Sequence, residues 1–287
     1  MALRAPDAPV PTGSTGRAGT DLGPSPAAAI GWLAGGAALT FVVSWLGTTV
    51  LGLHHDLYYL VYFTLALGYL GWFAARSRLA VRSLLREHLW WSIGLGALVA
   101  FAIVGQVMGQ PSTTHPSGGY FLFELVWRGV VYGTVDALVL SAFPALVALL
   151  VLRGNRKGAL RKVAFAGLVL VMSLVVSTSY HLGYSTYRGS ELSKPLIGTV
   201  MMNLPTVLTG NPAGAVVQHA TVHTTAVVHQ YYGGEDTNHF LPPELSSSYP
   251  DRPGGTAALA IAAAWLSVLV AVVALNRRRL RAALHAR

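Results

Sequence analysis

The sequence of 287 residues contains no cysteine. Disulfide bonds, thiolate nucleophiles and metal sites held by cysteine are therefore excluded. Charged residues are also scarce, at 11% of the chain, whereas a soluble domain has about 25%. Acidic residues are the scarcer sign, with 11 Asp and Glu against 20 Lys and Arg. These shortages argue against an ordinary soluble globular protein.

Hydrophobic residues, in contrast, make up 53% of the chain. They gather in runs of about 20 residues, which is the length that a helix needs to cross roughly 30 Å of hydrocarbon. The short alternating segments of an outer-membrane barrel are not seen. We therefore predict an all-α, polytopic membrane helix bundle with the lipid bilayer as a partner.

The apolar runs predict about eight spans, of which six are simple and two form a broken hairpin. The predicted spans are residues 27–53, 57–75, 89–108, 120–152, 163–182, 194–232 (the hairpin, broken at Thr209-Gly210-Asn211-Pro212) and 256–275. A six-span version, with 194–232 outside the membrane or re-entrant, fits the same pattern. Together the spans form one membrane domain, residues 27–276. A disordered tail is predicted at 1–26 because it is rich in small and polar residues, and a basic tail at 277–287.

Basic residues lie in short clusters between the apolar runs, which is how membrane topology is encoded. The N-terminal tail, two loops and the C-terminal tail hold 16 of the 20 Lys and Arg residues. The positive-inside rule assigns this side of the protein to the cytoplasm. We therefore predict a multi-pass protein of the plasma membrane with both termini in the cytoplasm and no nucleic-acid partner.

Ionisable residues within the apolar runs are the candidate functional residues, because a charge in a span costs roughly 2.5–3.5 kcal/mol on insertion scales. Glu124 and Arg128 stand four residues apart at the start of the fourth run, on one helix face. His181 ends the next run, and His219 and His223 form a second pair at helical spacing. Since successive spans alternate in direction, we expect all five near the same depth, toward the extracytoplasmic side.

These residue types suit two kinds of chemistry. A carboxylate can act as general base on water while imidazoles stabilise an oxyanion. Alternatively, His181, His219 and His223 can hold zinc or another divalent metal, and transmembrane histidines can also ligate haem. A structural ion pair between Glu124 and Arg128 is the third interpretation. Spacing alone does not choose among the three.

Three short motifs follow one another along the chain. Phe123–Gly129 reads Phe-Glu-Leu-Val-Trp-Arg-Gly, Ser177–His181 ends in His, and His219–His223 follows a Thr-Gly turn at Thr209–Gly210. In order and spacing they resemble the Glu-Glu-x-x-x-Arg-Gly, Phe-x-x-x-His and His-x-x-x-Asn motifs of the CPBP family of intramembrane proteases. This family includes the CAAX-processing and bacteriocin-processing enzymes and is also called the ABI family. The resemblance covers about residues 118–232.

The resemblance implies an intramembrane endopeptidase that hydrolyses a membrane-embedded or membrane-associated peptide. The family's first Glu is generally assigned the water-activating role. In an active version of this chain Glu124 would take that role, and Arg128 would keep its carboxylate ionised. Imidazoles would assist and stabilise the developing negative charge. The catalytic residues that the resemblance implies are Glu124, Arg128, His181, His219 and His223.

Three positions depart from the family pattern. Phe123 replaces the first Glu, Ser177 replaces the Phe of the second motif, and His223 replaces the Asn of the third. Three interpretations follow: Glu124 has taken over as base, the protein is an inactive relative that binds a peptide or lipid partner, or His223 has created a metal centre. Asp136 is a further carboxylate in the fourth run. On a regular α-helix it lies about three turns beyond Glu124 and roughly 120° round the axis.

Overall fold

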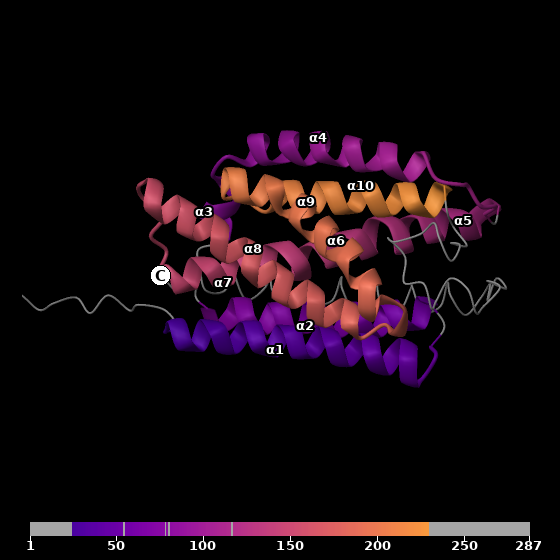
Figure 1. The fold of residues 1–287 in the computed structure, drawn as a ribbon, viewed down its shortest axis with the longest axis horizontal. Coiled ribbons are helices and arrows are strands. Elements are labelled where there is room, and N and C mark those ends of the chain that lie inside the picture. Colours follow the sequence, from indigo (N-terminus) through magenta and orange to yellow (C-terminus); the bar gives the residue numbers. More distant parts are fainter. Residues whose placement is uncertain (1–24, 54, 78, 80, 116, 230–287) are drawn as a thin grey trace, which may run out of the picture.

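The computed structural model describes residues 25–53, 55–77, 79, 81–115 and 117–229. In this part of the chain all regular structure is helical (Figure 1). The span predicted at 256–275 and the basic tail at 277–287 lie outside the described residues, as does nearly all of the predicted tail at 1–26.

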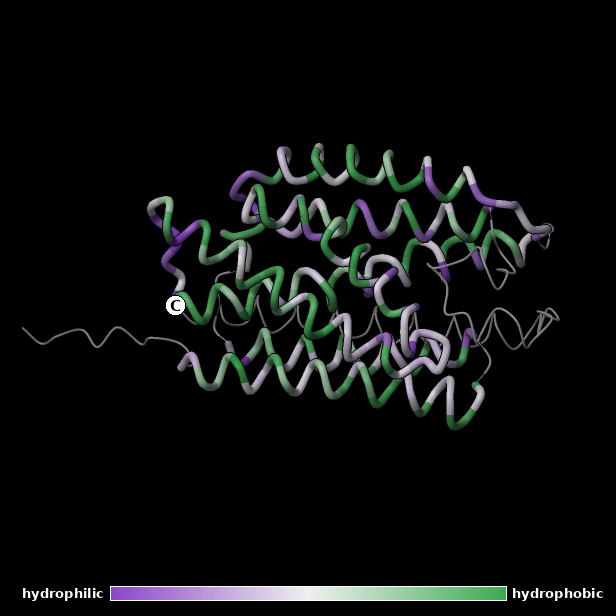
Figure 2. Tube along the Cα trace, in the orientation of Figure 1, coloured by the Kyte–Doolittle hydropathy of each residue, from purple (hydrophilic) through white to green (hydrophobic). Residues whose placement is uncertain are grey.

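Five helical segments are long and apolar enough to cross a membrane, and each matches a predicted run. They comprise α1 (Pro26–Ser44) with its π-helical extension η1 (Trp45–Val50), α2 (His55–Ser77), α4 (Leu89–Met108), the long segment 118–151, and α8 (Ala159–Leu182). A short helix, α3 (Val81–Arg86), joins the second and third of these. Hydrophobic residues run along most of their length (Figure 2). The chain is thus a multi-pass helical membrane protein.

The long fourth segment is the centre of the bundle. In its most apolar stretch 78% of residues are buried, against 28–39% in the other four spans. Neighbouring helices therefore cover it on most sides, whereas the other spans keep a wide face for lipid. Its helical type changes along its length: α5 (Gly118–Glu124), π-helical η2 (Leu125–Val131), α6 (Tyr132–Ala137), π-helical η3 (Leu138–Ala142) and α7 (Phe143–Val151).

The predicted broken hairpin is confirmed as α9 (Ser193–Thr209) and α10 (Ala213–His229). Gly210 ends α9 in the left-handed region at φ 73°, which costs glycine little. The side chain of Asn211 accepts a hydrogen bond from the N–H of Ala213 at 2.9 Å and so caps α10. Each helix has 17 residues, or about 26 Å, slightly less than a full span.

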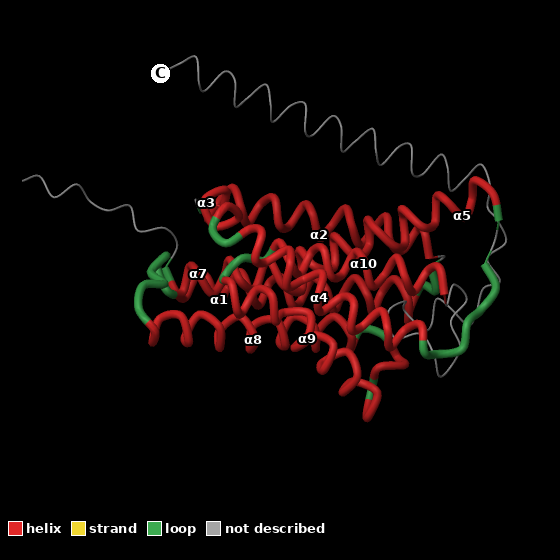
Figure 3. The backbone as a smooth tube through the Cα atoms, turned by 90° about the horizontal axis from the view of Figure 1, so that it is seen from above, coloured by secondary structure: helices red, strands yellow, loops and turns green. Residues whose placement is uncertain are grey.

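Helix α10 lies alongside α4 in both views (Figures 1 and 3), and α1 and α2 lie on the opposite side of the bundle in Figure 1. Helix α10 also packs against η2 and α6. A Cβ atom added at Gly133 would lie 2.7 Å from the carbonyl oxygen of His219. Glycine at this position, four residues after Gly129, therefore lets α10 approach the central segment closely.

The short 3₁₀ turns η4 (Ser185–Tyr187) and η5 (Gly189–Leu192) connect α8 to α9. One expectation at the start of α2 is wrong. The predicted spans 27–53 and 57–75 place His55 and Asp56 in the polar turn between them, but the two residues form the first helical residues of α2 and are buried. Asp56 is buried because it meets a cation of the central segment, described below. His54 lies outside the described residues.

Candidate functional site

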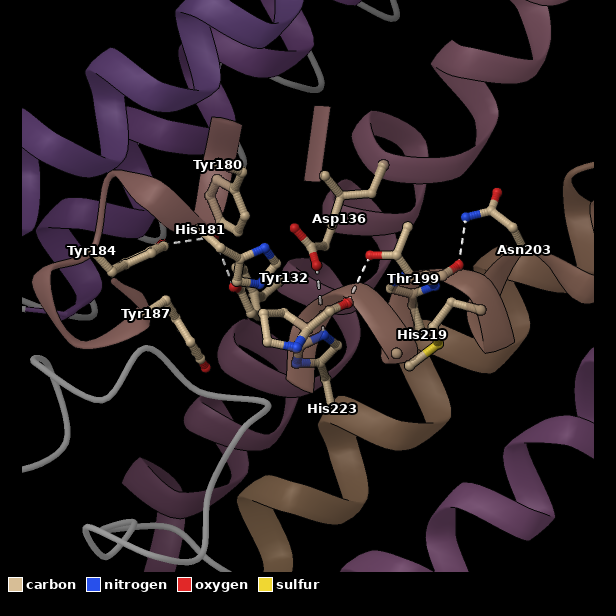
Figure 4. Close-up of a pocket in the computed structure, with 14 residues that line it drawn as sticks. Tyr132, Asp136, Tyr180, His181, Tyr184, Tyr187, Thr199, Asn203, His219 and His223 are labelled. Carbon is tan, nitrogen blue, oxygen red and sulfur yellow. Dashed lines mark hydrogen bonds and ion pairs between the residues drawn. The ribbon is translucent and has the colours of Figure 1, made fainter. Parts of the chain in front are cut away.

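A cavity of about 60 Å³ lies within the bundle, between the central segment and helices α8, α9 and α10. It has room for a few water molecules. Three of the sequence-predicted histidines share it. The lining residues are Tyr132, Asp136, Leu140, Tyr180, His181, Tyr184, Tyr187, Pro195, Gly198, Thr199, Met202, Asn203, His219 and His223 (Figure 4).

His181 reaches the cavity from the last turn of α8. Its Nδ1 donates a hydrogen bond to the carbonyl oxygen of Ser177 at 2.8 Å. The hydroxyl of Ser177 also lies 2.6 Å from the hydroxyl of Thr199, which ties α8 to α9. With Nδ1 protonated, Nε2 of a neutral His181 is the proton acceptor.

His219 and His223 enter the cavity from one face of α10, as their spacing predicts. Their rings are nearly parallel, with centroids 6.2 Å apart. Nδ1 of His219 donates to the carbonyl oxygen of Ala215 at 2.9 Å, so Nε2 is again the acceptor. The ring of His223 meets Tyr132 edge-on at 4.7 Å.

Asp136 supplies the carboxylate of this cavity. Its Oδ2 lies 3.8 Å from Nε2 of His223, within ion-pair range but longer than a hydrogen bond. Its Oδ1 accepts a hydrogen bond from the hydroxyl of Tyr62 at 3.2 Å. The carboxylate is therefore held from two sides, by α2 and by α10.

Sequence analysis did not assign Asp136 to the site, and the π-helical segment η2 explains why. A π turn closes i→i+5 hydrogen bonds and so inserts about one extra residue. One residue corresponds to about 100° of rotation. The insertion removes most of the 120° that would separate Asp136 from Glu124 on a regular α-helix. The signal that pointed to this residue was a lone acid in the middle of an apolar run.

Four tyrosine hydroxyls form a chain of hydrogen bonds beside the histidines. Tyr58 lies 2.5 Å from Tyr184, Tyr184 donates to Tyr180 at 2.7 Å, and Tyr180 lies 2.8 Å from Tyr132. Burial raises the pKa of Tyr184 well above its ordinary value, because the charged phenolate loses its hydration. The Tyr184 hydroxyl therefore stays protonated and remains a donor.

Glu124 and Arg128, the first predicted pair, do form an ion pair. Both are buried, and neither is among the residues that line the cavity. Arg128 also binds Asp56 of α2, with Nε to Oδ1 at 3.3 Å and Nη2 to Oδ2 at 3.4 Å. The structure thus separates the five predicted site residues into three that share the cavity and two that belong to a neighbouring ionic cluster.

The predicted metal set of His181, His219 and His223 is not assembled as a metal site. Within the described part of the chain, no three His, Asp or Glu side chains lie close enough to hold one ion. The ring of His181 instead meets Tyr180 and Tyr187 edge-on, at 5.1 and 5.0 Å. The cavity therefore offers acid–base groups rather than a ready coordination sphere.

The remaining histidines in the described residues have other surroundings. Nε2 of His229 donates a hydrogen bond to the carbonyl oxygen of Gln110 at 2.8 Å, which fastens the end of α10 to the end of α4. His115 stacks on Phe121 with ring centroids 4.1 Å apart. Neither lines the cavity.

Comparison with known proteins returned no match: no protein-family model, no curated protein and no solved structure resembles this chain significantly. The chemistry of the site therefore has to be judged from its own geometry. A buried carboxylate beside an imidazole, with two further imidazoles around an enclosed volume, is an arrangement that can move a proton.

Proposed function

We propose that this chain is a membrane-embedded hydrolase of the CPBP type, which cleaves a peptide bond of a membrane-associated peptide. The observation that supports this best is the Asp136–His223 pair, which shares one cavity inside the bundle with His181 and His219. The motif resemblance supports the same reaction, since His181 and His219 stand where that family has its histidines.

The structure changes the assignment of roles. Glu124, the base implied by the resemblance, is engaged with Arg128 outside the cavity lining. His223 is the better candidate base, because the Asp136 carboxylate beside it stabilises the imidazolium that forms when a proton is taken. Asp136 thus acts as a positioning and charge-balancing residue.

In the proposed step, Nε2 of His223 removes a proton from a water molecule, and the water oxygen attacks the peptide carbonyl carbon. His219 and His181, each fixed through Nδ1 by a backbone carbonyl, also line the cavity. The C–N bond then breaks, and the proton held by His223 passes to the leaving nitrogen.

The cavity alone is too small for a peptide, so the substrate must enter from its edge. The lining residues His181, Pro195 and Gly198 are partly exposed, at the connection of α8 with α9. The apolar side chains of Leu140 and Met202 line the deeper part. This division suits an apolar segment that presents one carbonyl group to the histidines.

The test is cleavage of a fluorogenic transmembrane peptide, with protein and peptide reconstituted together in phospholipid vesicles. His223→Ala and Asp136→Asn should each lower the cleavage rate by about 10²-fold or more. Glu124→Gln should lower it only as far as it lowers the folded fraction. His229→Ala, on the same helix but outside the cavity, is the matched control and should keep the rate. Unchanged cleavage in His223→Ala and Asp136→Asn would refute the mechanism.

We further propose that both termini face the cytoplasm, which puts the cavity edge toward the extracytoplasmic side. The basic connection between α7 and α8 supports this orientation. An enzyme reporter that is active only outside the cytoplasm should be active when fused after Gly189 and silent after Arg156. The reverse result would move the cavity to the cytoplasmic side.

A further inference from the structure

A second cavity, of about 320 Å³, lies at the end of the bundle where α4 and α8 begin and α9 ends. It is far from the histidine cavity in the fold, because His181 lies at the other end of α8. The residues lining the second cavity are Glu87, His88, Trp91, Leu95, Arg156, Lys162, Phe165, Val207, Leu208, Thr209 and Gly210.

One end of this cavity is polar and carries excess positive charge. Arg156 forms an ion pair with Glu87, donates to the carbonyl oxygen of Gly210 at 2.9 Å, and lies over the ring of Phe165 at 5.3 Å. The guanidinium is therefore fixed in place, and its charge is offset by the single carboxylate in the lining. The exposed side chain of Lys162 adds a second cation, so the fixed charges of the lining sum to a positive value.

The other end of the cavity is apolar and follows the helices into the membrane. Trp91 and Leu95 stand four residues apart on α4, and Val207 and Leu208 face them from α9. Trp91 and Leu208 are 74% and 67% exposed, although they lie beside a polar end. A large aromatic side chain with this exposure at a helix terminus is typical of the membrane–water interface.

The surrounding surface also favours an anion. The connection between α7 and α8 carries further basic residues outside the lining, and it is coloured hydrophilic in Figure 2. These basic residues are Arg153 and Lys157, and Arg161 follows in the first turn of α8. Basic pockets between helices on the cytoplasmic side of a membrane protein bind lipid phosphates.

We propose that this second cavity is a binding site for an anionic phospholipid. The headgroup phosphate lies between Lys162 and the fixed guanidinium of Arg156, and the acyl chains lie along Trp91 and Leu208. The cavity joins a cationic end to an apolar end over a single continuous volume, and a phospholipid has the same two parts in the same order. Free phosphate would use only the cationic end.

The experiment measures lipid binding to the delipidated full-length protein in detergent by native mass spectrometry. The probes are dioleoylphosphatidylglycerol and dioleoylphosphatidylcholine, which share acyl chains and differ in net charge. We expect the anionic lipid to bind about tenfold more tightly. Lys162→Gln should raise the Kd of the anionic lipid about fivefold, the effect of one basic residue near a membrane surface, and Lys162→Arg should restore it. Lys157→Gln, an exposed lysine of the same connection outside the lining, is the matched control and should have a smaller effect.

Three outcomes would overturn the proposal. Equal affinity for the two lipids would show that the charged end does not select the ligand. Equal losses in Lys162→Gln and Lys157→Gln would show a diffuse surface attraction instead of a site. Displacement of the anionic lipid by millimolar inorganic phosphate would assign the cavity to a soluble phosphate.

Discussion

The central segment carries two buried polar clusters, and their buried charges are balanced in different ways. Near its start, Arg128 binds Glu124 and Asp56, so one cation meets two carboxylates. Further along, Asp136 lies 3.8 Å from His223 and accepts a hydrogen bond from Tyr62, beside a cavity. The first cluster is packed with permanent charges, and the second joins one carboxylate to groups that gain and lose protons.

This difference shows why the presence of a charged pair in a span does not by itself locate a functional site. A buried ion pair whose members are fully engaged with each other keeps its charge state and offers nothing to a substrate. An imidazole beside a cavity and a carboxylate can donate or accept a hydrogen bond toward a bound molecule. The ionic cluster therefore joins α2 to the central segment, and the Asp136–His223 pair is the candidate for chemistry.

The largest effect should come from removing the cation of the ionic cluster. Arg128→Met leaves Glu124 and Asp56 buried as like charges, which should cost about 3–5 kcal/mol of stability. The measurement is unfolding in detergent, followed by circular dichroism. Adding Asp56→Asn and Glu124→Gln to Arg128→Met should recover most of this loss, since no uncompensated charge then remains buried.

Asp136→Asn is the matched change in the other cluster. The asparagine keeps an acceptor for the hydroxyl of Tyr62, and a neutral His223 leaves no uncompensated charge buried. Its stability should therefore stay within about 1 kcal/mol of the wild type. If Asp136→Asn destabilised the protein as much as Arg128→Met, the two clusters would both be structural, and the distinction between them would fail.

A smaller loss is expected from separating α10 from the central segment. Gly133→Ala places a Cβ atom 2.7 Å from a backbone oxygen of α10, and such overpacking costs about 1–3 kcal/mol. The substitution should also move His219 and His223 away from Asp136. Peptide cleavage should then fall by more than the loss of folded protein alone explains. Gly167→Ala is the control, because a Cβ atom there meets nothing within 4 Å. Equal thermal stability of the two variants would contradict the close approach of α10.

Much of the membrane architecture could be predicted from the sequence because it depends on local composition. The five confirmed spans are apolar runs of sufficient length, and the break between α9 and α10 follows from Gly210 and Asn211. The shared face of His219 and His223 follows from helical spacing alone. The span predicted at 256–275 stays a prediction, since it lies outside the described residues.

The composition of the site was harder to predict because it depends on where helices cross. The carboxylate expected beside the histidines was Glu124, and the one found there is Asp136. On a regular α-helix Asp136 would lie on a different face from Glu124. The π-helical segment η2 rotates it back toward the face of Glu124. The sequence places Asp56 in the turn between two predicted spans, and its partner Arg128 comes from a helix distant in the sequence.

Taken by itself, the sequence determined that this protein is a helical membrane protein, where most of its described spans run, and that three histidines belong to one depth of the bundle. Hydrophobic length and helical period are local quantities, so they can be read directly from the residues. Only the tertiary structure decided which carboxylate lies beside the histidines and which two carboxylates bind Arg128. Those pairings join helices that are remote in the chain, and they depend on a π turn and on a glycine contact whose effects appear only when the helices pack.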